Sequence, residues 1–208
     1  MARKDRNGNR KTREQRRTHR VPEMGYYLIV TDTEATERIY FNGIYESLPE
    51  KVKGKLVIKV IETKTKKLVE ECKEFALYDP QYRIPWIVFD RDKVVNFDDI
   101  IREAEAEGVS VGWSNPCFEI WYLLHFRYST KSYCSNDEVI KELSAYIQDY
   151  SKSKDVFELI IGKLETAFKN AKKLEDYHFE NGTLDAIKKI PSTEVYKIVD
   201  KIIQNKSD

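Results

Sequence analysis

The sequence has few cysteines, and this limits the class of protein that it encodes. Its three cysteines, Cys72, Cys117 and Cys134, are odd in number and form no CxxC pair, which argues against a disulfide scaffold and fits a reducing compartment. The sequence has no apolar run of 18 residues and no apolar core of a signal peptide. We therefore expect a cytoplasmic protein that does not bind a membrane. The GxxxxGK[ST] motif is also absent, and we expect no ATP hydrolysis by this chain itself.

Positive charge is concentrated in residues 1–22, although the chain as a whole carries a formal net charge of only +1. This stretch has nine Lys and Arg residues against Asp5 and Glu14, a net of +7, which leaves 27 basic and 33 acidic residues in the rest, a net of −6. A basic arm on a mildly acidic body is typical of a protein that binds nucleic acid. The alternative is a tail that only improves solubility. We expect a disordered arm, and its candidate nucleic-acid-binding residues are Arg13, Arg16, Arg17 and Arg20.

Strands and helices are expected to alternate in residues 23–115, which predicts an α/β core. Apolar and β-branched runs predict strands, and apolar residues at helical spacing predict helices. The expected strands are 26–31, 55–61, 84–90 and 109–114, and the expected helices are 36–48, 66–77 and 97–107. Near-continuous apolar strands joined by helices of about a dozen residues indicate a mainly parallel sheet that is flanked by helices on both faces.

Residues 116–208 are expected to form a C-terminal helical extension that packs on this core. The expected helices are 116–126, 136–146, 156–174 and 193–204. Asn96 and Asn115 precede predicted helices and are expected to cap them, Asn96 with Asp99 as its reciprocal partner. Pro116 suits the first helical position, where its missing N–H is not needed.

Carboxylates follow two of the predicted strands at the points where the strands end. Asp32 follows the strand 26–31, and Asp90 and Asp92 stand at the end of the strand 84–90. Ligands of a parallel sheet bind outside the carboxyl ends of its strands, so we expect these carboxylates to converge. Converging carboxylates repel each other unless a cation neutralises them, and oxygen ligands favour Mg²⁺ or Mn²⁺ over zinc. The spacing predicts a metal site for phosphoryl chemistry, and the alternative is a solvated acidic loop.

Four stretches of the chain resemble the motifs of the RloB family, a Toprim-like family that includes the AbiL type of abortive-infection component of phage-defence loci. They are LIVTDTEATERIYF from Leu28, VFDRD from Val88, SNPCFEIWYLLHF from Ser114 and IPSTEVYKIV from Ile190. The third stretch is long and specific. The resemblance implies a Toprim-like α/β core with an added helical region, a metal-dependent nuclease activity with Mg²⁺ or Mn²⁺, and an ABC-type ATPase as a protein partner.

The resemblance also implies roles for individual residues. Asp90 and Asp92 match the DxD pair that holds the divalent ion in the family. The first motif of the family has Glu followed by Gly, whereas this chain has Asp32 and Thr33. Aspartate is one methylene shorter, and a displacement of about 1 Å can lower a catalytic rate 10²-fold. Either the turn is rebuilt so that Asp32 or Glu34 reaches the ion, or catalysis is weakened in this protein.

Other charged residues in the motifs are candidates for the same site. Glu37 matches the Thr-Glu of the first motif, and Glu119 lies in the SNPCFE stretch. Each is either a catalytic residue or an acidic residue that stabilises the first turn of a helix. Arg91 and Lys93 flank Asp92 and are expected to bind phosphates of a nucleic acid.

Two functions of different classes follow from these motifs. The first is an Mg²⁺-dependent endonuclease, in which Asp90 and Asp92 hold the ion and Asp32 or Glu34 assists it, with DNA or RNA, including tRNA, as the substrate. The second is a catalytically weak subunit that binds nucleic acid or regulates an ATPase partner. Divalent-ion-dependent cleavage that is lost in Asp90→Ala separates the two.

Overall fold

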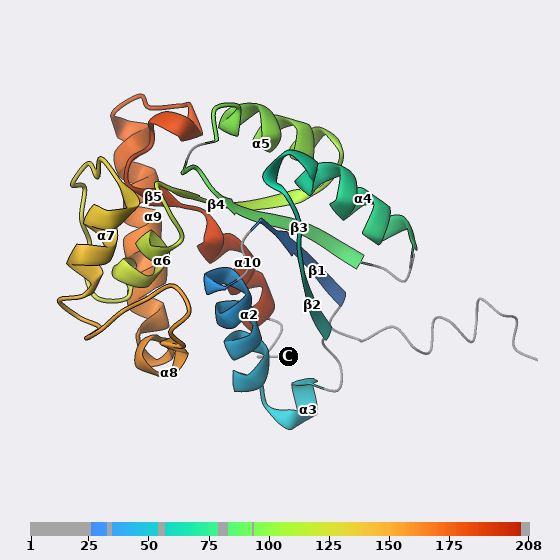
Figure 1. Cartoon of the computed structure of the whole chain (residues 1–208), viewed down its shortest axis with the longest axis horizontal. Coiled ribbons are helices and arrows are strands. Elements are labelled where there is room, and N and C mark those ends of the chain that lie inside the picture. The colour runs from blue at the N-terminus through green and yellow to red at the C-terminus, as the bar shows by residue number, and fades with distance from the viewer. Residues whose placement is uncertain (1–25, 33–34, 54–56, 79–82, 93, 205–208) are drawn as a thin grey trace, which may run out of the picture.

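The computed structural model describes residues 26–32, 35–53, 57–78, 83–92 and 94–204 (Figure 1). The predicted basic arm, with its four candidate arginines, lies outside the described residues, and so do Glu34 and Lys93. In the part of the chain that is described, no helix is both long and apolar enough to cross a membrane.

The centre of the molecule is a five-stranded mixed sheet with the strand order β2-β1-β3-β4-β5. The strands are β1 (Tyr26–Thr31), β2 (Val57–Glu62), β3 (Arg83–Asp90), β4 (Ser110–Asn115) and β5 (Ser192–Thr193). The first four strands are parallel to their neighbours, and β5 pairs antiparallel with β4. The expected mainly parallel α/β fold is therefore confirmed.

Helices surround the sheet and continue beyond it. The helices are α2 (Thr36–Ser47), α3 (Glu50–Lys53), α4 (Leu68–Tyr78), α5 (Phe97–Ala106), α6 (Glu119–Leu124), α7 (Asn136–Leu143), α8 (Phe157–Ile160), α9 (Leu164–Glu180) and α10 (Val195–Gln204). Short 3₁₀ turns span Thr65–Lys67, Ile161–Lys163 and Ala186–Lys188. In Figure 1, α4 and α5 lie on one side of the sheet, α2 and α10 lie on the other, and α6 to α9 gather beyond β5.

The strands are apolar on both faces because each face is covered. Alternate residues of β3 point to opposite faces: Ile87 and Phe89 pack in the core under α4 and α5, and Trp86 and Val88 pack in the core shared with α2, α6 and α10. α10 places buried apolar residues at helical spacing, as a helix that lies on a sheet requires. These residues are Val195, Ile198, Val199 and Ile202.

The C-terminal residues belong to the sheet layer as well as to the helical extension. The short strand β5 was not predicted, because a two-residue strand has no periodicity and depends on its partners Ser114 and Asn115. The predicted helix 156–174 is divided by a 3₁₀ turn at Ile161–Lys163 into α8 and α9, and α9 continues to Glu180. The chain therefore leaves the core after β4 and returns to it at β5 and α10.

Asn96 occupies the predicted N-cap position of α5, whereas the predicted helix cap at Asn115 is wrong. Asn96 precedes α5, but its side chain makes no capping hydrogen bond. Asn115 is the last residue of β4, and its Nδ2 donates to the backbone oxygens of Ala186 and Ile187, each at 3.0 Å. The next helix starts only at Glu119, so Asn115 joins two segments of the fold instead of capping a helix.

Candidate active site at the carboxyl edge of the sheet

The carboxyl ends of β1, β3 and β4 lie at the same edge of the sheet, and each continues into a polar residue or turn. Thr31 pairs with Val88, so Asp32 and Asp90 leave the sheet at almost the same level. Asp90 pairs with Ser114 of β4. This edge is where the ligands of parallel sheets bind, and it carries the acidic residues that the sequence singles out.

Three buried carboxylates share one small cavity at this edge. Asp90 from the end of β3, Glu37 from the first turn of α2 and Glu119 from the first turn of α6 line a cavity of about 130 Å³. Glu37 and Glu119 are each 1% exposed and Asp90 is 8% exposed. Carboxylates are rarely buried so completely unless a partner compensates their charge. We call Glu37, Asp90 and Glu119 the acidic triad.

The position of each member of the acidic triad is fixed by its own element. Tyr122 of α6 donates a hydrogen bond from its hydroxyl to the backbone oxygen of Thr36 at 3.3 Å, which ties the start of α2 to α6. Tyr150 donates from its hydroxyl to Oε1 of Glu119 at 2.9 Å. The triad therefore lies on a packed framework of β3, α2 and α6 rather than on a surface loop.

The electrostatics of the cavity favour either protons or a cation. Burial is the main cause that raises the pKa of Asp90 well above its usual range, and the charges of Glu37 and Glu119 raise it further. Oδ1 of Asp90 and Oε2 of Glu119 are buried and have no hydrogen-bond donor among the residues that the structure describes. These two oxygens are available to a hard cation, which oxygen ligands bind well.

The loop after β3 turns Asp92 away from the cavity. The backbone N–H groups of Arg91 and Asp92 donate to the carbonyl oxygens of Ser114 and Pro116 at 2.8 and 3.1 Å. Asp92 has a φ of 26°, it is exposed, and its Oδ1 accepts a hydrogen bond from Nδ2 of Asn136 at 3.2 Å. Alternation along an extended chain predicts Asp92 on the same side as Asp90, but the turn ends that alternation.

Asp32 lies beside the acidic triad but lines a different cavity. Its Oδ2 accepts a hydrogen bond from Oγ1 of Thr65 at 2.5 Å, and it borders a hollow of about 600 Å³ together with Glu62 and Lys64. Burial is the main cause that raises the pKa of Asp32. The charge of Asp32 also contributes to the raised pKa of Asp90, so the two residues act on each other electrostatically.

The predicted metal set Asp32, Asp90 and Asp92 is thus not gathered into one cavity. Within the described ranges, no group of three or more His, Cys, Asp and Glu side chains has the geometry to hold a metal ion as it stands. The structure instead brings Asp90 together with Glu37 and Glu119, two residues that the motifs suggest as catalytic candidates. Metal binding stays a prediction, and its most favourable position is the acidic triad.

Two residues of this site have no motif in the sequence. Lys152 lines the cavity of the acidic triad, and Tyr150 binds Glu119. Both lie in the segment between α7 and α8, which has neither a motif nor a periodic pattern. The sequence therefore gives no signal that this segment returns to the sheet edge.

His125 and Cys117 have structural positions in the core beside the site. His125 is 1% exposed, its Nδ1 lies 2.8 Å from the backbone oxygen of Trp121, and burial lowers its pKa to about 4. Burial, followed by the charges of Glu119 and Asp90, raises the pKa of the Cys117 thiol well above its usual range. A thiol that keeps its proton is a poor nucleophile, which disfavours cysteine chemistry at this edge.

The fold and the site define an α/β protein with an acidic centre at the carboxyl edge of its sheet. The family model of the RloB-like proteins matches residues 27–202, so the chain belongs to the RloB-like protein family. No curated protein and no solved structure matches the chain.

Proposed function

We propose that this RloB-like protein is a divalent-metal-dependent nuclease that acts in phage defence. The observation that carries the proposal is the acidic triad, in which three carboxylates from separate elements share one cavity at the ligand-binding edge of the sheet. Burying three acids together costs stability, because each loses its hydration and repels the others. Clusters of buried titratable groups that lower the stability of the fold are typical of functional sites.

The donor set of the site fits a hard cation. All the donors of the triad are carboxylate oxygens, and Asp90 and Glu119 each keep one buried oxygen without a hydrogen-bond donor among the described residues. Mg²⁺ is usually held by one or two carboxylates together with water and substrate phosphate, so a preformed group of three ligands is not required. When bound, such an ion supplies Lewis acidity and a water of lowered pKa.

The residues of the chain have distinct roles in this proposal. Asp90 and Glu119 hold the ion, and Glu37 adds negative charge and orients water in the same cavity. Asp32, which lies next to this cavity, assists through its charge. Arg91 lies in the loop after β3 and binds a phosphate of the incoming strand, together with the basic arm.

A second function is favoured by the hydrogen bond between Asp32 and Thr65. This bond holds Asp32 in the neighbouring hollow, away from the cavity of the acidic triad. If Asp32 does not move during the reaction, the protein is a catalytically weak subunit that binds nucleic acid or regulates a partner. In both functions we propose an ABC-type ATPase as the protein partner, as the resemblance to the RloB family implies. This partner would hydrolyse the ATP, since the chain has no GxxxxGK[ST] motif of its own.

The experiment that tests the proposal is a cleavage screen with the full chain. Supercoiled plasmid DNA and total tRNA are incubated with the protein in Mg²⁺, in Mn²⁺ or in EDTA, with and without the proposed ABC-type ATPase partner. The proposal predicts nicked or shortened products only in the presence of the divalent ion. Products that form equally in EDTA, or no products under any condition, would contradict it.

A further inference from the structure

Lys152 brings a positive charge to the acidic triad, although nothing in the sequence motifs points to it. It lines the same cavity of about 130 Å³ as Glu37, Asp90 and Glu119. The residue as a whole is exposed, so its side chain lies at the opening of the cavity and not in its floor. Lys152 is therefore accessible from solvent to a substrate that approaches the triad.

The backbone around Lys152 is fixed to the site at two points. Oγ1 of Thr36, at the start of α2, donates a hydrogen bond to the backbone oxygen of Lys152 at 3.1 Å. Two residues earlier, the hydroxyl of Tyr150 donates to Glu119 at 2.9 Å. The segment from Tyr150 to Lys152, which we call the strap, is thus joined both to the helix that carries Glu37 and to the residue Glu119.

Lys152 carries a positive charge at neutral pH, as lysines ordinarily do. The residue is exposed to solvent, and an exposed ammonium group interacts only weakly with neighbouring carboxylates through water. A cation that is held beside hard-metal ligands at an open edge has the chemistry to bind an anionic oxygen of a phosphate.

We infer that Lys152 is a further catalytic residue of the site, which contacts the phosphate of the scissile phosphodiester and stabilises the negative charge that develops there. This inference rests on the proposed nuclease function and adds a substrate contact to it. Anionic phosphate oxygens are typical partners of lysine, which acts as a point charge. A positive group that is positioned before the reaction stabilises the developing charge without reorganisation of solvent. The strap supplies that positioning, because the backbone of Lys152 is held by Thr36.

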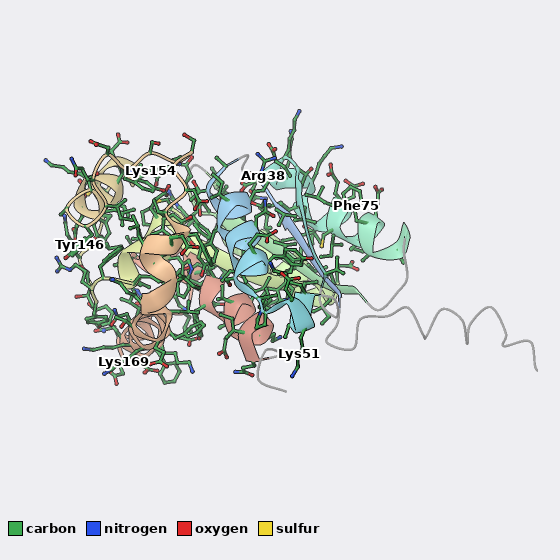
Figure 2. The ribbon with its side chains drawn as sticks, turned by 90° about the horizontal axis from the view of Figure 1, so that it is seen from below. Arg38, Lys51, Phe75, Tyr146, Lys154 and Lys169 are labelled. Atoms are coloured by element: carbon green, nitrogen blue, oxygen red, sulfur yellow. The ribbon has the colours of Figure 1, made fainter. Side chains whose placement is uncertain are left out.

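The test uses four variants of the full chain with two readouts. Lys152→Ala removes the charge, Lys152→Arg keeps it, and Asp90→Asn reports on the nuclease function itself. Lys154→Ala is the matched control, since Lys154 lies on the same connection (labelled in Figure 2) and its ammonium donates to the backbone oxygen of Gln148 rather than lining the cavity. The readouts are the single-turnover cleavage rate in Mg²⁺ and the Kd for fluorescein-labelled tRNA and a labelled 30-base-pair duplex in Ca²⁺.

We expect Lys152→Ala to cleave roughly 10²-fold more slowly, the loss that is typical when one stabilising group is removed. Its log–log salt dependence of Kd should be less steep by about 1, because one phosphate contact is lost. Lys152→Arg should recover most of the affinity, and Lys154→Ala should match the wild type in rate.

The outcomes separate this inference from the proposed function. If Asp90→Asn abolishes cleavage while Lys152→Ala keeps the wild-type rate, Kd and salt dependence, the nuclease function stands and the inference about Lys152 is wrong. If the wild type itself does not cleave, the nuclease function fails and the catalytic role of Lys152 fails with it. The binding readout then tests the phosphate contact alone: a lower salt dependence in Lys152→Ala supports that contact, and an unchanged one overturns it.

Discussion

At the scale of single residues, the site depends on how the charges of Glu37, Asp90 and Glu119 are compensated. Each is buried, and each comes from a different element. Burial raises the pKa of Asp90, and the charges of Glu37 and Glu119 raise it further. Protonation of Asp90 or binding of a cation would relieve the repulsion among these carboxylates.

The length of the side chain at position 32 should affect the cleavage rate, because Asp32 lies beside the cavity of the acidic triad but does not line it. We expect Asp32→Glu to increase the cleavage rate, because one more methylene extends the carboxylate toward the cavity of Asp90, and we expect Asp32→Ala to lower it at least about 10-fold. Cleavage rates of both variants measure this directly. Glu62→Gln, which changes an exposed acid of the same hollow, is the matched control and should behave as the wild type. A wild-type rate in Asp32→Ala would exclude Asp32 from the site.

The buried His125 should make the free energy of unfolding depend on pH. Its pKa is lowered to about 4 by burial, from a usual value of 6.5, so the unfolded chain binds a proton that the folded chain does not. The stability that depends on neutral His125 is present above pH 6.5 and is lost as the pH falls toward 4, by roughly 3 kcal/mol in total. The free energy of unfolding from urea titrations at pH 4 to 7.5 should fall more steeply for the wild type than for His125→Phe. Equal slopes would show that His125 keeps its usual pKa.

The acidic residues of the site could be predicted from the sequence, but their grouping could not. The motifs point to Asp90, Glu37 and Glu119 as candidates, and the structure brings these three together. The expected partner Asp92 binds Asn136 instead. Its positive φ places it in a turn, which the alternation of side chains along a strand does not predict. Lys152 reaches the cavity through tertiary contacts of an irregular segment, for which no local pattern exists.

At the scale of elements, the contact between α2 and α8 determines how closely the helical extension approaches the core. Gly43 of α2 faces Phe157 of α8, and a Cβ at position 43 would lie 2.4 Å from Cγ of that ring. Only a glycine therefore allows this packing.

We expect Gly43→Ala to destabilise the protein by about 1–3 kcal/mol, the usual cost of overpacking, although alanine is the better helix former. Thermal unfolding monitored by circular dichroism gives the measurement. Gly162→Ala is the matched control, because a Cβ there would meet nothing within 4 Å, and its Tm should be unchanged or higher. Equal Tm values for Gly43→Ala and the wild type would show that α2 and α8 are not closely packed.

The elements themselves were largely predictable because most are periodic. The four parallel strands and the helices of residues 23–115 follow their predicted ranges within a few residues, since each buries an apolar face or is apolar throughout. The short helix α3 was not predicted. Two other differences from the prediction depend on distant partners. β5 exists only because it pairs with β4, and the start of α6 is delayed to Glu119 because Asn115 is held in the sheet and binds residues 186 and 187.

At the scale of the whole molecule, charge is divided between a basic arm and an acidic body. Deletion of residues 1–22 removes nine Lys and Arg residues, and each phosphate contact contributes about 0.7–0.9 to the log–log salt dependence of nucleic-acid binding. We expect the deletion to weaken binding and to lower that slope by several units, while the fold and its Tm are kept. The measurement is the Kd for labelled tRNA and duplex DNA from 50 to 200 mM salt.

The control for this deletion is an arm of unchanged length in which Arg13, Arg16, Arg17 and Arg20 are replaced by serine. If the charge of the arm determines the binding, this variant should have a less steep log–log salt dependence of Kd than the wild type, although its chain length is unchanged. An unchanged salt dependence of Kd in both variants would favour the alternative that the arm only improves solubility.

The measurement that tests the central claim most directly is the cleavage rate of Asp90→Asn in Mg²⁺, compared with Asp176→Asn as a control at an exposed position of α9. The account predicts that Asp90→Asn abolishes cleavage, whereas Asp176→Asn cleaves as the wild type does. It also predicts that the Tm of Asp90→Asn without divalent ions is equal to or higher than that of the wild type, because the substitution relieves repulsion among the buried carboxylates. Full cleavage activity in Asp90→Asn would contradict the assignment of the acidic triad as the active site.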